Sequence, residues 1–208
     1  MKSPFDTVRA FEEALCEFTG APYAVTVNSC TMALLLAVKW QLEWGNRPRD
    51  GVVSIPNRTY LSVPMSIIHA GGYPTFRDED WKGCYQLSPL PVHDSARMFG
   101  RGMYSLRFAP GDMVCVSFHA TKVLADTQGG AILLDDPDAY LWLKRMRFDG
   151  RTEGIAPIDD TITEIGYHCY MSPDVAARLL HKIGTMGDDL VVLPNDNYPD
   201  LSTLGVFQ

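Results

Sequence analysis

The stretch MVCVSFHATKVL, residues 113–124, joins a short apolar run to a polar exit that contains a lysine. Met113–Val116 has the composition of a buried strand, and Ser117 and His119 follow it directly. Lysine side chains are usually found at solvated surfaces, yet Lys122 stands only a few residues beyond the apolar run. The stretch therefore predicts a strand buried on both faces, with a lysine close to its carboxyl end.

The composition is that of an ordinary globular protein. The chain has 208 residues, of which 46% are hydrophobic and 21% charged, which suits one domain with or without a short appendage. The formal net charge of −7 argues against nucleic acid or an anionic membrane as a partner, because both require a basic surface.

Cysteine and histidine usage excludes several classes of site. The five cysteines are odd in number and form no C-x-x-C pair, so neither a disulfide framework nor a zinc site is expected, and a cytoplasmic location is predicted. The histidines are not spaced as metal ligands, and no metal is predicted. The start of the chain does not resemble a signal peptide, and no apolar run has the length of a membrane span.

Short apolar runs alternate with amphipathic segments along the chain. The runs predict strands at 23–27, 51–55, 73–76, 90–93, 113–118 and 130–134. The amphipathic segments predict helices at 5–18, 32–44, 60–70, 138–146 and 173–183, the first of them starting at the Ser3–Pro4 pair. This alternation predicts an α/β fold with a mainly parallel sheet and helices on both faces.

Polar residues follow four of the predicted strands, at 28–31, 57–60, 94–97 and 117–122. Ligands of parallel α/β sheets bind beyond the carboxyl ends of the strands. We therefore expect these four exits to lie along one edge of the sheet and to contain the functional residues.

The first exit opens a helix. The backbone N–H groups of Thr31 and Met32 lie in its first turn, where an anion such as a phosphate binds readily. The alternative is that Ser29 or Thr31 only caps the helix.

The second and third exits offer a ring and an acid. Tyr60 is suited to stack on a planar ligand, and the alternative is a tyrosine of the core or of a partly buried surface. Asp94 ends a buried strand, where a carboxylate costs free energy unless it is paired. Its partner is either a cationic ring nitrogen or Arg97, three residues away.

Lys122 in the fourth exit has two interpretations. A partly desolvated lysine loses its proton more readily and forms Schiff bases. The alternative is a lysine that extends to water or pairs with Asp126.

Taken together, the four exits supply what pyridoxal 5'-phosphate (PLP) requires, namely phosphate donors, a stacking ring, a carboxylate for the ring nitrogen and an amine for the aldehyde.

The order and spacing of these motifs resemble the DegT/DnrJ/EryC1/StrS family of sugar aminotransferases, from the first helix to about residue 185. The segments that carry the resemblance are NSCTMAL (28–34), PNRTY (56–60), VHDSARMFG (92–100), SFHATK (117–122) and GYHCYM (166–171). The resemblance implies an α/β fold in which a mainly parallel sheet is sandwiched by helices, as in the large domain of fold type I PLP transferases. It further implies a PLP-binding large domain at 1–186 and a short tail at 187–208, with the family's small C-terminal domain mostly missing.

The resemblance also implies roles at the catalytic end of the cofactor. Lys122 would form the Schiff base and move the proton, and Asp94 would hold the pyridine nitrogen. Tyr60 would stack on the ring. Arg97 stands where the family has a glutamine that contacts the phenolic oxygen.

At the phosphate end, the resemblance implies donors from Thr31, Met32 and Ser117. His168, at the position of a family asparagine, would reach the phosphate of the neighbouring subunit in a homodimer. Other departures from the family pattern are Cys30 for glycine, Gln128 for glutamate and Tyr170 for arginine.

The implied activity is that of a PLP-dependent aminotransferase. The amino group would pass from an amino acid, expected to be glutamate, to a keto sugar that is expected to be nucleotide-linked. The alternative is a PLP-binding dimeric remnant with little or no transaminase activity. Dehydration on the same scaffold is disfavoured, because the family's dehydratases have histidine where this chain has Lys122.

Overall fold

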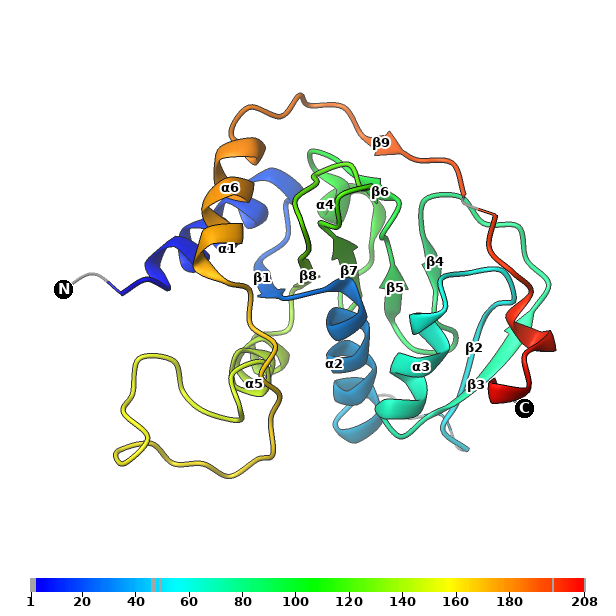
Figure 1. Ribbon diagram of the computed structural model, residues 1–208, viewed down its shortest axis with the longest axis horizontal. Helices are drawn as coiled ribbons and strands as arrows, with labels where there is room; N and C mark the ends of the chain where they lie inside the picture. The colour runs from blue at the N-terminus through cyan, green and yellow to red at the C-terminus, as the bar shows by residue number, and fades with distance from the viewer. Residues whose placement is uncertain (1–2, 46–47, 49, 196, 208) are drawn as a thin grey trace.

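The computed structural model describes residues 3–45, 48, 50–195 and 197–207 (Figure 1). The helices are α1 Asp6–Thr19, α2 Cys30–Glu43, α3 Ser62–His69, α4 Met103–Arg107, α5 Pro137–Met146 and α6 Pro173–Ile183. The strands are β1 Tyr23–Val27, β2 Val52–Pro56, β3 Tyr73–Arg77, β4 Tyr85–Gln86, β5 Val92–Asp94, β6 Met98–Phe99, β7 Met113–Ser117, β8 Gly130–Leu134 and β9 Val191–Val192. Two 3-10 helices, η1 Leu201–Thr203 and η2 Gly205–Phe207, follow β9.

The helices and strands expected from the apolar pattern are present, with ends shifted by one or two residues. Helix α1 begins at Asp6 rather than at the Ser3–Pro4 pair, and Phe5 is its N-cap. Pro64 lies in the first turn of α3, where its missing N–H group is not needed. The elements that the pattern did not predict are the short ones, namely α4, β4, β6, β9 and the two 3-10 helices.

The central sheet contains β1, β8, β7, β5 and β4, in that order. Strands β5 and β7 are parallel, whereas the β1–β8, β7–β8 and β4–β5 pairs are antiparallel. The α/β class is confirmed, but the sheet is mixed rather than mainly parallel. The reason is that β8 returns beside β7 and β5 returns beside β4 through loops, without the helical crossover that a parallel pair requires.

The strands that precede three of the polar exits nevertheless share one direction. Strands β1 and β7 are each antiparallel to β8, and β5 is parallel to β7. Their carboxyl ends therefore meet at the same edge of the sheet. Strand β2 pairs with β3 in a separate parallel pair, and a bridge between Ser54 and Ser88 connects β2 to the segment before β5.

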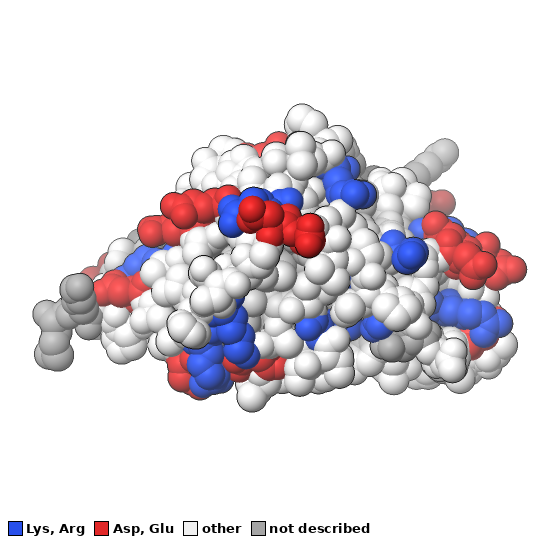
Figure 2. All heavy atoms as spheres, turned by 90° about the horizontal axis from the view of Figure 1, so that it is seen from above, with Lys and Arg blue, Asp and Glu red and all other residues white. Residues whose placement is uncertain are grey.

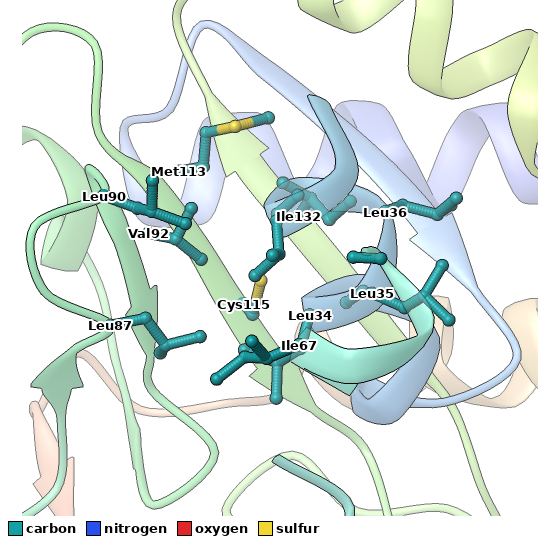
Figure 3. Close-up of a cluster of buried hydrophobic side chains, with 14 of the residues drawn as sticks. Leu34, Leu35, Leu36, Ile67, Leu87, Leu90, Val92, Met113, Cys115 and Ile132 are labelled. Atoms are coloured by element: carbon teal, nitrogen blue, oxygen red, sulfur yellow. The ribbon is translucent and has the colours of Figure 1, made fainter. Parts of the chain in front are cut away.

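Two helical layers cover the sheet, because alternate residues of each strand face opposite sides. On one face, Met113 and Cys115 of β7 join a cluster with α2, α3 and α5, part of which Figure 3 shows. On the other face, Val114 and Val116 join a cluster with α1, α4 and α6. The sandwich of helices expected around the sheet is thus present.

A buried ion cluster joins α1, β1 and the end of α5. Arg147 is 1% exposed and Glu12 is 5% exposed. The Arg147 guanidinium donates to the Glu12 carboxylate and, over 2.6 Å, to the carbonyl of Thr26, while Lys144 Nζ lies 2.9 Å from Glu12 Oε2. Burial acts to raise the pKa of Glu12, but the charges of Arg147 and Lys144 outweigh it, so that this pKa is lowered.

The C-terminal segment, described at 187–195 and 197–207, leads from α6 to the far side of the molecule and ends beside β3 (Figure 1, orange to red). Strand β9 pairs antiparallel with β6 on the way. Leu201 in η1 is fully buried. The segment therefore packs along the domain that carries the sheet.

The surface carries charges of both signs. Figure 2 shows acidic and basic side chains interspersed over the face in view. Within the described ranges, no helix has the length and apolar character needed to cross a membrane.

Candidate active site

A cavity of about 290 Å³ opens at the sheet edge where β1, β5 and β7 end. All four polar exits contribute to it. Its lining includes Ser29, Cys30, Thr31, Thr59, Tyr60, Trp81, Asp94, Ala96, Arg97, Ser117, His119, Lys122, Gln128, Gly129 and Tyr198. The four exits therefore converge as expected, although the second follows β2 of the separate parallel pair and not a strand of the central sheet.

Lys122 reaches the cavity from a turn after β7. Its backbone N–H donates to the carbonyl of His119 over 2.9 Å, and its side chain is half-buried. Asp126, the alternative partner that the sequence offered, is engaged by two cations of α6, with Arg178 at 2.9 Å and Lys182 at 3.0 Å. Hydrogen bonds from Arg178 are the main reason that the pKa of Asp126 is lowered.

The carboxylate of Asp94 is held on both oxygens. Oδ1 accepts the backbone N–H of Ala96 over 2.9 Å, and Oδ2 accepts the Tyr85 hydroxyl over 2.8 Å. Tyr85 in turn lies 2.6 Å from the hydroxyl of Thr59. Burial raises the pKa of Asp94, against the opposing effect of these two donors and of the charge on Lys122. A carboxylate in this state gains stability from a cationic partner in the cavity.

The first turn of α2 forms the wall next to β8. Ser29 is the N-cap, and its hydroxyl accepts the N–H of Met32 over 3.3 Å, so the capping role considered for Ser29 is confirmed. The Thr31 hydroxyl lies 2.8 Å from that of Ser62. Gly130 allows β8 to start against this turn, because a Cβ there would lie 2.5 Å from the Cys30 nitrogen.

Three thiols lie around Asp94, in Cys30, Cys84 and Cys115. Burial raises the pKa of each, and the negative charge of Asp94 raises it further. For Cys84 the pKa rises to about 12. Cys30, which replaces the family glycine, therefore faces the cavity as a neutral thiol.

Of the remaining predicted residues, all but Met32 line one of two neighbouring cavities. Tyr60 is 60% exposed and Arg97 is 6% exposed, and both line the main cavity with Ser117. His168 lines a neighbouring cavity of about 200 Å³ and lies 2.8 Å from Asp149. Met32 is not among the residues that line either of these two cavities.

Sequence reasoning missed four residues of the site: Thr59, Trp81, Tyr85 and Tyr198. Tyr85 lies opposite Asp94 in the pairing of β4 with β5, and a two-residue strand gives no periodic signal. Tyr198 belongs to the C-terminal segment and comes from a distant part of the chain. Thr59 had a signal, since it precedes Tyr60 within the quoted PNRTY motif.

The donor set fits PLP. The ring nitrogen would face Asp94, whose buried carboxylate is held by two neutral donors and gains stability from a cation. The aldehyde would face Lys122, and the ring would lie against Tyr60. The N-terminus of α2 is the positive end of the helix dipole, and its first turn contains no acidic residue. This end of the helix therefore suits a phosphate. In the part of the chain that the structure describes, no group of three or more His, Cys, Asp or Glu side chains is arranged to hold a metal ion.

Replacing Tyr85 by phenylalanine is expected to raise the pKa of Asp94 further, because a donor to the charged form is removed. A ¹³C NMR titration of the Asp94 carboxylate in the cofactor-free protein measures this. Tyr104→Phe is the matched control, since the Tyr104 hydroxyl donates to the carbonyl of Asp112, outside the cavity. An unchanged Asp94 pKa in Tyr85→Phe would show that the hydroxyl does not stabilise the carboxylate.

Known proteins share both the sequence pattern and the fold. The model of the DegT/DnrJ/EryC1/StrS aminotransferase family matches residues 2–95 and 92–189. The spore coat polysaccharide biosynthesis protein SpsC of Bacillus subtilis is 31% identical over 170 residues, which cover 63% of this chain and 42% of SpsC. The UDP-4-amino-4-deoxy-L-arabinose–oxoglutarate aminotransferase of Shewanella sediminis is 26% identical over 213 residues, with 81% and 53% covered.

The fold is that of solved relatives. The crystal structure of AtS13 from Actinomadura melliaura superposes with a TM-score of 0.73 at 22% identity, covering 88% of this chain and 60% of AtS13. The chain thus spans about half the length of the relatives that it matches.

Proposed function

The chain belongs to the DegT/DnrJ/EryC1/StrS aminotransferase family, and we propose that it binds PLP in the main cavity and transfers an amino group to a keto sugar. The observation that carries the proposal is the convergence of Lys122, Asp94 and Tyr60 on one cavity. When bound, the cofactor supplies the electron sink for the negative charge that develops at the reacting carbon. The side chains of this protein bind it, orient it and move protons.

Lys122 and Asp94 are the catalytic residues of the proposal. Lys122 Nζ would hold the cofactor through its aldehyde carbon and, once the amino donor has taken that place, carry the proton to and from the reacting carbon. Asp94 would accept the N–H of the pyridinium and keep that nitrogen protonated. Tyr60 would cover one face of the ring, and Arg97 would donate to the phenolic oxygen.

The phosphate would lie at the start of α2. Thr31 and Met32 would offer backbone N–H groups, and Ser117 its hydroxyl. The Met32 N–H is engaged by Ser29 over 3.3 Å, which is long for a hydrogen bond, so exchange for a phosphate oxygen costs little.

We further propose a homodimer, in which His168 reaches the phosphate bound by a second copy of the chain. The support is its position: His168 is largely exposed and lines a cavity that shares Gln128 and Gly129 with the main one. A side chain at that place is accessible from outside the subunit.

Glutamate is the proposed amino donor and a nucleotide-linked keto sugar the proposed acceptor. The name of the relative from Shewanella sediminis pairs a UDP-linked amino sugar with oxoglutarate, which are the products expected from that kind of acceptor and from glutamate. The family membership of this chain supports the same pairing.

The test is spectroscopic. Purified protein titrated with PLP is expected to develop the absorbance band above about 400 nm of the lysine-bound cofactor. Glutamate should convert this band to that of the pyridoxamine form, and a UDP-linked keto sugar should restore it. Oxoglutarate added in place of glutamate is the control and should leave the band unchanged. Absence of the band would overturn cofactor binding, whereas a band that glutamate leaves unchanged would point to the dimeric remnant without transaminase activity.

A further inference from the structure

The C-terminal segment is attached to the loops that build the cavity. Its first anchor is at β9, where the N–H of Leu193 donates to the carbonyl of Arg97 over 2.8 Å. Asn195 then donates through its side-chain amide to the carbonyl of Trp81. Arg97 and Trp81 both line the cavity, so this part of the segment is bound directly to two of its walls.

The second anchor holds the loop that precedes Tyr60. The N–H of Leu201 donates to the carbonyl of Asn57 over 2.8 Å, and the Asn57 side chain donates to Asp200 over 3.1 Å. Arg58 lies 3.9 Å from the same carboxylate. Because Leu201 is fully buried, this anchor combines apolar packing with hydrogen bonds.

Tyr198 lies between the two anchors and lines the cavity. Its ring meets that of Tyr60 edge to face, with centroids 6.5 Å apart and planes at 68°. It also stacks against Trp81, with centroids 6.4 Å apart and planes at 14°. Both separations lie within the range of attractive aromatic pairs.

Tyr60 depends on such a neighbour for its orientation. Its side chain is 60% exposed, so packing against the body of the domain restricts it little. Trp81, by contrast, is 9% exposed, and its indole N–H donates to the carbonyl of Arg58 over 2.9 Å. The sequence of contacts from Trp81 through Tyr198 to Tyr60 therefore leads from a fixed ring to an exposed one.

We propose that Tyr198 is a positioning residue, whose ring holds Tyr60 in the orientation that covers the bound cofactor and completes the outer wall of the cavity. The inference rests on the proposed function, because it concerns how tightly the cofactor is held. It assigns a role to a residue outside the motifs of the family resemblance. A ring that is already oriented loses less conformational entropy when the ligand binds.

The test compares three single variants by their affinity for PLP, measured in the absence of substrate by quenching of tryptophan fluorescence. Tyr198→Ala is expected to weaken PLP binding about two- to tenfold, the range for loss of one aromatic pair. Tyr198→Phe keeps the ring and should bind as the unmodified protein does. Phe207→Ala is the matched control, because it removes a ring of the same segment that packs on Phe76 and not on the cavity.

A double variant separates positioning from a general loosening of the segment. If Tyr198 acts through Tyr60, Tyr198→Ala should weaken binding no further when Tyr60→Ala is already present. The circular dichroism of the bound cofactor should fall in Tyr198→Ala and recover in Tyr198→Phe. Equal PLP affinity of Tyr198→Ala and the unmodified protein, or an equal loss in Phe207→Ala, would overturn the inference. Failure of the unmodified protein to bind PLP would instead overturn the proposed function.

Discussion

Replacing Lys122 by alanine is expected to abolish the absorbance band above about 400 nm of the lysine-bound cofactor and to reduce transamination on the order of 1000-fold or more. The side chain has two tasks, because it attaches the cofactor and carries the proton at the reacting carbon. An amine added with the buffer performs neither task as well, because it lacks the fixed position that the turn after β7 gives to Lys122. Steady-state kinetics and the absorbance spectrum measure the two losses separately.

Borohydride reduction locates the attachment site independently of turnover. In the unmodified protein, the reduced cofactor is expected on the peptide that contains Lys122, as identified by mass spectrometry. Lys39→Ala is the matched control, because Lys39 pairs with Glu43 on α2, away from the cavity, and its loss should leave the label in place. A stable label on a different lysine would contradict the assignment.

Replacing Arg147 by methionine is expected to lower the free energy of unfolding by about 3–5 kcal/mol, the usual cost of removing one partner from a buried ion pair. The change leaves Glu12, which is 5% exposed, without its main counter-charge. Urea unfolding followed by circular dichroism measures the loss. Arg101→Met is the control on an exposed arginine that pairs with Asp188, and it should change stability by no more than about 0.5 kcal/mol.

The same cluster predicts how stability depends on pH. The pKa of Glu12 in the folded protein lies below its ordinary value of 4.5. The ionised cluster therefore stabilises the fold above about pH 4.5, and this contribution is lost as the pH falls through the folded-state value. Glu12→Gln should remove this part of the acid sensitivity, and combined with Arg147→Met it should recover part of the lost stability. A double variant less stable than Arg147→Met alone would contradict the account.

The sequence predicted the parts of the fold whose pattern extends over a whole element. Strands β1, β7 and β8 are apolar apart from Thr26 and Ser117, and α6 has a strong amphipathic face. The direction of β8 could not be obtained in this way, because an apolar run has the same composition in a parallel and in an antiparallel pair. The order of strands depends on the loops that connect them, and the loop after Lys122 contains no helix.

The candidate site was predictable where its residues follow strands that an apolar run marks, and not where they come from two-residue strands or distant segments. Asp94 ends β5 and Lys122 lies in the turn after β7, so their convergence follows from the shared direction of these strands. Tyr85 reaches Asp94 only because β4 pairs with β5. Tyr198 reaches Tyr60 only because the C-terminal segment returns to the loop at Asn57. Such contacts are set by tertiary packing and leave no local pattern.

The thiols around Asp94 have a consequence for which nucleophile meets the cofactor. A thiolate adds to an aldehyde carbon as an amine does, whereas a neutral thiol is far less nucleophilic. Cys30 lies in the same cavity as Lys122, and its pKa is raised first by burial and then by the charge of Asp94. Burial, reinforced by the carboxylate that would hold the ring nitrogen, thereby suppresses sulfur chemistry beside Lys122. In this site, chemoselectivity for the amine over the thiol would follow from burial first and from the acid second.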